Sequence, residues 1–180
     1  RQFTKLKCRL MPYLYGAAVE AHEHGTPVLR PMMLEFPEDP ACDTLDRQYM
    51  LGDKLLVAPV FTKAGDVQYY LPTGTWENLL TGNTAEGNCW QKEKHGFMTL
   101  PLMVRPGTVL PLGKCDTRPD YDYADGVELH VYHLTEGATA VCRIPALDGS
   151  IAATYTVSMV NGKPRVETDA TKPYTVVIHA

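Results

Sequence analysis

Apolar residues recur at three- and four-residue steps over residues 3–23, and this spacing predicts an amphipathic helix. Pro12 falls within the pattern, so either the helix is kinked there or two helices meet there. Gly25 follows the last turn, where a glycine commonly ends a helix. The apolar face consists of Phe3, Leu6, Leu10, Leu14, Ala17, Ala18 and Ala21.

An apolar run at residues 28–34 predicts a buried strand, which ends in an acidic, proline-bearing turn at residues 35–40. Residues 43–51 then show the helical spacing of apolar side chains. Helix, turn, buried strand and helix is the order found in α/β barrels. One and a half such units cannot close a sheet, because a parallel strand without a neighbour leaves its backbone groups unpaired. We therefore expect residues 1–54 to be the end of a barrel whose other strands lie upstream.

From residue 55 onward, apolar runs of strand length alternate with glycine and proline turns, which predicts antiparallel β-sandwiches. Residues 147–150 and the Asn161-Gly162 pair are typical hairpin turns. The polar, tyrosine-rich segment 114–125 is interpreted as a linker. The predicted strands are 55–61, 67–71, 76–80, 97–100, 103–105, 108–112, 127–134, 138–144, 151–160, 164–168 and 175–179.

Composition and charge exclude several classes of protein. The chain has 180 residues, of which 44% are hydrophobic, so it can bury a substantial core. A net charge of −4 argues against binding to nucleic acid or to an anionic membrane. Apolar runs stay well below the roughly 20 residues of a membrane span. The cysteines are odd in number and form no CxxC pair, so we expect free thiols and a cytoplasmic location. They are Cys8, Cys42, Cys89, Cys115 and Cys142.

A cluster of carboxylates is the first candidate for chemistry, because it follows the predicted barrel strand, where such barrels hold their active sites. Glycoside hydrolysis needs two carboxyl groups roughly 5–9 Å apart. Acidic residues before a helix also serve as ordinary caps, and we favour capping over catalysis here. The cluster consists of Glu35, Glu38, Asp39, Asp43 and Asp46.

The remaining candidates have simpler structural explanations. His22 and His24 lie two residues apart, so their side chains point apart on a helix and do not form a metal site. Cys89 and His95 lack an acid clearly placed to complete a triad. Aromatic side chains could stack on sugar rings, but most aromatics of a β-sandwich fill its core. These are Tyr69, Tyr70, Trp76, Trp90, Tyr121 and Tyr123. We therefore assign no catalytic, substrate-binding or metal-binding residue, and no cofactor.

Five long motifs of this chain resemble the late-barrel and C-terminal signature of glycoside hydrolase family 31. They are RLMPYLY (9–15), GTPVLRPMMLEFPEDPAC (25–42), RQYMLGDKLLVAPVF (47–61), GDVQYYLPTGTWENLLTG (65–82) and HGFMTLPLMVRPGTVLPLG (95–113). Within the family, the resemblance is strongest to bacterial α-xylosidases, and it extends through RPDY and AVCRIPALDGS in the C-terminal half.

The resemblance implies a retaining exo-acting α-glycosidase on a (β/α)8 barrel, in which two aspartates act as nucleophile and general acid/base. Both aspartates belong to motifs upstream of RLMPYLY, so none is carried over to a residue of this chain. The implied fold class is mainly β, with antiparallel β-sandwich domains preceded by the last helix–strand–helix of the barrel. Residues 1–54 would end the barrel, residues 55–118 would form a proximal sandwich and residues 119–180 part of a distal β domain.

Two functional hypotheses follow from this combination. In the first, the chain is the C-terminal part of an α-xylosidase-like or α-glucosidase-like enzyme and closes its barrel. Its partners are then the upstream portion of that enzyme and, through it, an α-xyloside or α-glucoside oligosaccharide. In the alternative, it is a freestanding β-sandwich module that binds carbohydrate or another protein without catalysis. The N-terminal helix and strand favour the first hypothesis, because a self-contained module would not need them.

Overall fold

The predicted N-terminal helix is two helices, α1 (Gln2–Arg9) and α2 (Met11–His24). Pro12 lies in the first turn of α2, where its missing N–H has no helical partner to lose. Gly25 ends α2 in the left-handed conformation, with φ of 75°, as the sequence predicts. The computed structural model describes residues 1–179 and divides into two units. Unit 1 contains Arg1–Thr26 and the chain from Gly107 onward, and unit 2 is Pro27–Pro106.

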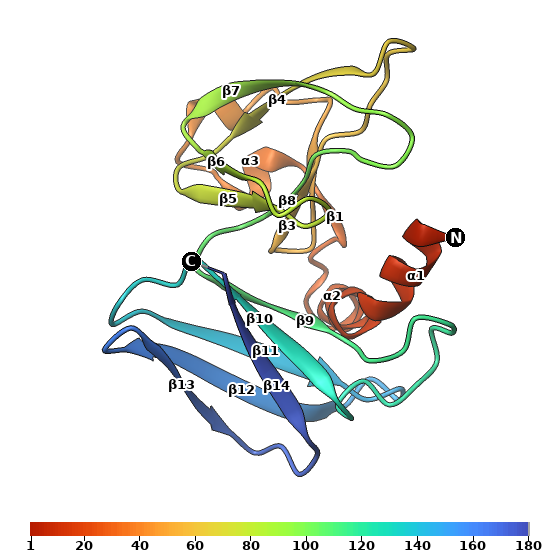
Figure 1. Cartoon of the computed structure of the whole chain (residues 1–180), viewed down its shortest axis with the longest axis vertical. Helices are drawn as coiled ribbons and strands as arrows, with labels where there is room; N and C mark the ends of the chain where they lie inside the picture. Colours follow the sequence, from red (N-terminus) through yellow and green to blue (C-terminus); the bar gives the residue numbers. More distant parts are fainter. Residues whose placement is uncertain (180) are drawn as a thin grey trace. The chain divides into compact units, whose positions relative to one another are not determined.

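Unit 1 is built around two three-stranded sheets (Figure 1). The first sheet has the order β14-β10-β9, and the second has the order β11-β12-β13. All neighbours are antiparallel except β10 and β14, which run parallel, contrary to the antiparallel arrangement expected for the C-terminal part. The strands are β9 (Thr108–Leu112), β10 (Val127–Tyr132), β11 (Thr139–Pro145), β12 (Ile151–Val160), β13 (Lys163–Thr168) and β14 (Tyr174–His179).

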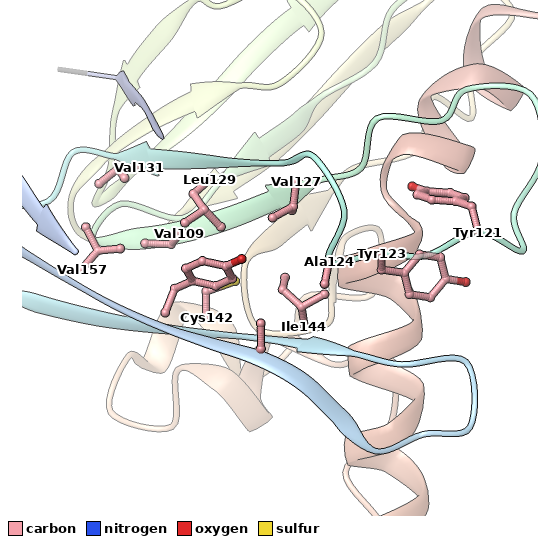
Figure 2. Close-up of a cluster of buried hydrophobic side chains, with 12 residues drawn as sticks. Val109, Tyr121, Tyr123, Ala124, Val127, Leu129, Val131, Cys142, Ile144 and Val157 are labelled. Carbon is pink, nitrogen blue, oxygen red and sulfur yellow. The ribbon is translucent and has the colours of Figure 1, made fainter. Parts of the chain in front are cut away.

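The core of unit 1 lies between these sheets. Figure 2 shows Val109 and Leu129 of one sheet pointing toward Cys142 of the other. Strand β12 buries every second residue from Ala153 to Met159, which is the alternation of a strand with one apolar face. The turn Asn161-Gly162 has φ of 53° and 70°, so both residues are left-handed, as a two-residue hairpin between β12 and β13 requires.

The interpretation of residues 114–125 as a linker is wrong, because the segment packs into unit 1. Tyr121 is 5% exposed and Tyr123 is 3% exposed, and their rings meet edge to face with centroids 4.9 Å apart. The Tyr121 hydroxyl donates a hydrogen bond of 2.8 Å to the carbonyl of Cys8 in α1. Gly113 permits this contact, because a Cβ there would stand 1.9 Å from the Tyr121 hydroxyl. Tyrosine richness therefore marks a packed segment that joins α1 to the sheets.

Unit 2 contains a six-stranded sheet, ordered β1-β2-β3-β8-β5-β6, and a two-stranded sheet of β4 and β7 (Figure 1). All of its strand pairs are antiparallel. Two short helical segments, α3 (Met32–Glu35) and η1 (Pro40–Cys42), precede β2. The strands are β1 (Leu29–Arg30), β2 (Tyr49–Leu51), β3 (Leu55–Val57), β4 (Asp66–Leu71), β5 (Thr75–Asn78), β6 (Thr84–Glu86), β7 (Cys89–Lys94) and β8 (Leu102–Val104).

Several local predictions for unit 2 need correction. The apolar run 28–34 is a two-residue strand followed by α3, and β1 pairs antiparallel with β2. Residues 49–51 form β2 where helical spacing had suggested a helix, because tertiary pairing with β3 overrides local periodicity. Residues 97–100 form no strand, whereas β6 and β7 went unrecognised in polar sequence. The expected boundary at residue 54 lies between β2 and β3, which are hydrogen-bonded neighbours, and the division into domains there stays a prediction.

The core of unit 2 is rich in large side chains from both of its sheets. Trp76, Tyr69 and Leu56 are fully buried, and the indole N–H of Trp76 donates to the carbonyl of Pro72 at 2.8 Å. Gln48 is also buried, and its amide exchanges two hydrogen bonds with the backbone of Tyr70, at 2.7 and 2.8 Å. This side chain thus pairs backbone groups of β4 that β7 does not reach.

A histidine pair joins the parallel strands of unit 1. Nδ1 of His130 in β10 lies 2.9 Å from Nε2 of His179 in β14, and Nε2 of His130 lies 3.1 Å from the carboxylate of Glu128. Glu128 also accepts a hydrogen bond of 2.7 Å from the guanidinium of Arg9. Burial lowers the pKa of His130 below its ordinary value, and the nearby His179 lowers it further, although Glu128 acts in the opposite direction.

We expect Leu56→Ala to lower the free energy of unfolding by about 2–5 kcal/mol, because it leaves a cavity at a site that is 0% exposed. The matched control is Phe61→Ala, at a side chain that is 71% exposed, which should change stability by only about 0.5 kcal/mol. Urea denaturation midpoints of the two variants and the parent measure the difference. Equal midpoints for both variants would contradict the assignment of β3 to the core.

The free energy of unfolding should also decrease as the pH falls below about 6.5, the ordinary pKa of histidine. Because the folded pKa of His130 is lowered, the unfolded chain binds the proton first, so acid favours unfolding until the folded pKa is passed. Urea titrations at several pH values measure the slope, and His130→Gln should reduce it. An unchanged slope in that variant would show that other groups cause the dependence.

Candidate functional site

Glu35, the last residue of α3, takes part in a largely buried ion cluster. Glu35 accepts a bond of 2.7 Å from Arg30 through one oxygen and a bond of 2.9 Å from Arg105 through the other. The side chains of Arg30 and Glu35 are only 4% and 13% exposed. The guanidinium of Arg105 also lies 4.6 Å from the centre of the Phe36 ring. Glu35 therefore neutralises two cations that belong to the fold and is not placed to exchange a proton with a substrate.

Asp39 has a capping role, as the sequence suggested for this cluster. Its carboxylate accepts from the backbone N–H of Ala41 at 3.1 Å, at the start of η1, and from the hydroxyl of Tyr70 at 2.9 Å. Burial, together with the bond to Asp39, raises the pKa of Tyr70 to about 12. The other carboxylates of the predicted cluster, Glu38, Asp43 and Asp46, are exposed.

The histidines at the end of α2 show no metal-binding arrangement. Nε2 of His24 lies 3.8 Å from the carboxylate of Glu23, and both side chains are more than half exposed. Within residues 1–179, no group of three or more histidine, cysteine or acidic side chains is arranged to hold a metal ion.

The aromatic candidates divide into core residues and one exposed ring. Trp76, Tyr69 and Tyr121 are buried, so they cannot stack on a ligand. Trp90 is 52% exposed and packs its edge against Tyr70, with ring centroids 5.9 Å apart. The expectation that most aromatics fill the core is therefore confirmed.

His95 has an acidic partner that sequence reasoning did not recognise. Its Nε2 lies 2.6 Å from one oxygen of Glu93, whose other oxygen accepts a bond of 2.6 Å from the hydroxyl of Tyr69. Nδ1 of His95 lies 3.0 Å from the hydroxyl of Thr99. Cys89 takes no part, because its thiol donates to the carbonyl of Glu86.

Of the hydrogen-bonded side chains Tyr69, Glu93, His95 and Thr99, the last three line an open groove, which we call the β6–β7 groove. Its lining comes from the turn before β6, from β6 itself, from β7 and from the segment that follows β7; the residues used below are Asn83, Gln91, Glu93, Lys94, His95 and Thr99. The groove has a volume of about 760 Å³, within the range of roughly 300–1,000 Å³ for small-molecule sites. The groove is open to solvent and lined mainly by polar side chains.

A sequence signal for the groove exists but is weak. Gln91, Glu93 and His95 occupy alternate positions, so in a strand they share one face. Charged residues lie between them, so the segment lacks the apolar alternation of a strand and its sequence resembles a loop. Strand β7 was therefore not predicted from the sequence. Tyr69, which lies on β4, joins the cluster only through the pairing of β4 with β7, in which it stands opposite Gln91.

The cysteines differ in environment. Within residues 1–179 none forms a disulfide; Cys8, Cys42 and Cys142 are buried, whereas Cys89 is exposed. Burial and the neighbouring Asp39 and Asp43 raise the pKa of Cys42 to about 11, which keeps this thiol protonated and unreactive. Hydrogen bonds from Thr117 lower the pKa of Cys115. A search of the described helices finds none that is both long and apolar enough to span a membrane.

Family profiles match most of the chain in two segments. Residues 25–110 match the C-terminal domain of glycosyl hydrolase family 31, and residues 122–180 match the C-terminal domain of α-xylosidase YicI.

Curated relatives are similar over most of the chain. An α-xylosidase of Emericella nidulans is 42% identical over 73% of this chain and 18% of its own length. α-Xylosidase XylQ of Lactiplantibacillus pentosus is 33% identical over 96% of this chain and 23% of its own length. The chain thus spans about a fifth of the length of these relatives.

Solved structures show the same fold. A dextranase of glycoside hydrolase family 31 from Flavobacterium johnsoniae superposes with a TM-score of 0.82 at 25% identity, over 98% of this chain and 24% of its own. The α-xylosidase Xac1773 of Xanthomonas citri, of the same family, superposes with a TM-score of 0.79 at 25% identity, over 97% of this chain and 21% of its own. This chain belongs to glycosyl hydrolase family 31 and carries the C-terminal domain of that family.

Proposed function

We propose that this chain is the C-terminal, structural part of a larger retaining α-glycosidase of the α-xylosidase or α-glucosidase type. The observation that carries the proposal is the similarity to such enzymes along nearly the whole chain, which spans only about a fifth of each relative. The larger protein would remove terminal α-linked sugars, with its two catalytic carboxylates supplied by the upstream barrel.

The state of the carboxylates in this chain supports a structural role. Glu35 is held between two guanidinium groups, and Asp39 caps η1 and accepts from Tyr70. A retaining glycosidase needs one carboxylate free to attack the sugar and one able to donate a proton. Neither Glu35 nor Asp39 has that freedom, which supports the proposal that the two catalytic carboxylates come from the upstream barrel.

The location and partners form part of the same proposal. The upstream barrel is the principal partner, and an α-xyloside or α-glucoside oligosaccharide is the substrate of the complete enzyme. A cytoplasmic location is supported by five cysteines without a disulfide among the described residues.

The isolated 180-residue chain should not hydrolyse a chromogenic α-xyloside, whereas the longer protein that contains it should. The measurement is release of nitrophenol from p-nitrophenyl α-D-xyloside by both proteins at equal concentration. Turnover by the isolated chain that survives substitution of Glu35, Glu38 and Asp39 would place catalytic groups elsewhere in this chain. A longer protein that hydrolyses neither an α-xyloside nor an α-glucoside would refute the proposed activity.

Glu35→Gln separates a structural carboxylate from a catalytic one. The change leaves the buried Arg30 and the partly exposed Arg105 without their shared anion, so stability should fall by about 3–5 kcal/mol. Glu38→Gln, at an exposed position, is the matched control and should change stability by about 0.5 kcal/mol or less. In the longer protein, assayed well below its melting temperature, kcat should remain close to that of the parent. A loss of kcat without a loss of stability would assign Glu35 to catalysis.

A further inference from the structure

We propose that the β6–β7 groove is a saccharide-binding surface. The inference rests on the proposed function, because an enzyme that acts on oligosaccharides would gain substrate contacts from a second binding surface. The ligand class is a neutral oligosaccharide with vicinal hydroxyl groups.

The position of the groove follows from the sheet topology. Strand β6 is the last strand of the six-stranded sheet, and β7 pairs only with β4 in the two-stranded sheet. The two sheets of unit 2 therefore end beside each other here, and side chains from both line the depression. Gln91, Glu93 and Lys94 of the lining lie on β7, and a strand holds ligand-binding groups more accurately than a loop does.

Two hydrogen bonds hold the carboxylate of Glu93 in one orientation. Its oxygens are bonded to Tyr69, which is 0% exposed, and to His95, whose side chain is 9% exposed. The Glu93 side chain itself is 33% exposed. Each carboxylate oxygen has a second lone pair, so Glu93 can accept further hydrogen bonds from a ligand in the groove. A partly exposed acceptor fixed by buried partners is the arrangement that preorganised binding sites use.

The lining offers both donors and acceptors with little net charge. Asn83 and Gln91 contribute amides, Thr99 a hydroxyl, Lys94 an ammonium and Glu93 a carboxylate. A site for an anion would present several cations, and a metal site would present several carboxylates. The balance observed here suits a neutral ligand whose hydroxyl groups both donate and accept hydrogen bonds, as those of a saccharide do.

An apolar loop stands next to this polar lining. The chain leaves the groove at His95 and returns to it at Thr99, and between them Phe97 is 102% exposed and Met98 is 53% exposed. Phe97 and Met98 are adjacent, so together they expose a contiguous apolar surface beside the groove, and contiguous exposed apolar surface is what marks an interaction site. The flat ring gives the apolar C–H face of a pyranose a surface to stack on, while the groove binds its hydroxyl groups.

The test is a titration of the 15N-labelled 180-residue chain with maltotriose and, separately, with α-D-xylosyl-(1→6)-D-glucose, followed by backbone amide shifts. We expect shifts confined to residues 81–99, with a Kd on the order of 1 mM for at least one sugar. Phe97→Ala should weaken binding by about tenfold without affecting folding, because its side chain makes no buried contact. Glu93→Gln should weaken binding by about fivefold, since a neutral acceptor replaces a charged one.

The control variant is Phe61→Ala, which removes another exposed ring, 71% accessible, from outside the groove lining and should leave binding unchanged. Inorganic phosphate is the control ligand and should cause no shifts. The proposal is overturned by an absence of sugar-dependent shifts, by shifts elsewhere in the chain, or by phosphate acting like the sugars. It is also overturned if the isolated chain binds but the longer protein does not bind at this surface, since the groove would then be covered by protein.

These outcomes are distinguishable from failure of the proposed function. A longer protein that hydrolyses an α-xyloside while this chain binds no sugar would overturn the groove alone. Sugar binding by this chain with no hydrolysis by the longer protein would overturn the enzymatic proposal and leave the groove as a carbohydrate-binding site.

Discussion

The burial of one apolar sheet face against another is the constraint on which each unit depends. In unit 1, a lone three-stranded sheet would leave Val127, Leu129 and Val131 in contact with water, and these residues are buried only because β11 and β12 face them. Unit 2 meets the same requirement by packing a two-stranded sheet and α3 on a six-stranded sheet. The turns, caps and ion pairs of both units serve to keep these faces together.

The packing of the sheets also explains why Glu35 and Arg30 form an ion pair that is largely buried. Glu35 lies where chain segments meet in unit 2, and it joins α3 to Arg30 of β1 and to Arg105 beyond β8. Burial makes such a cluster costly to break, although an ion cluster in itself is weak evidence for added stability. The carboxylates that a glycosidase would need must instead be accessible and poised to gain or lose a proton. Of the acidic cluster after β1, Glu35 and Asp39 have structural partners within unit 2.

Glu93 differs from Glu35 in one physical respect that bears on function. Both carboxylates are held by two partners, but Glu35 balances two cations inside the protein, whereas Glu93 is fixed by a tyrosine and a histidine at the wall of an open groove. Glu93 lines this groove and its side chain is 33% exposed, so a ligand can reach the carboxylate. In a family of sugar-cleaving enzymes, a surface of this kind gives the C-terminal part a means to contact carbohydrate in addition to its structural role.

The sequence by itself determined the secondary structure wherever one local rule dominated. It indicated a kink or a helix junction near Pro12, and the junction lies at Leu10; it also predicted the glycine end of α2, the Asn161-Gly162 hairpin and most strands of the C-terminal half. Long motifs also identified the family. Only the tertiary structure decided the fate of the 114–125 segment and of β7, because their partners in α1 and β4 lie far away in the sequence. Residues 49–51 pair with the adjacent β3 and also with the more distant β1, and this pairing outweighs their helical spacing. The groove was decided in the same way: Tyr69 and Glu93 stand 24 positions apart, and only the β4–β7 pairing brings the hydroxyl to the carboxylate.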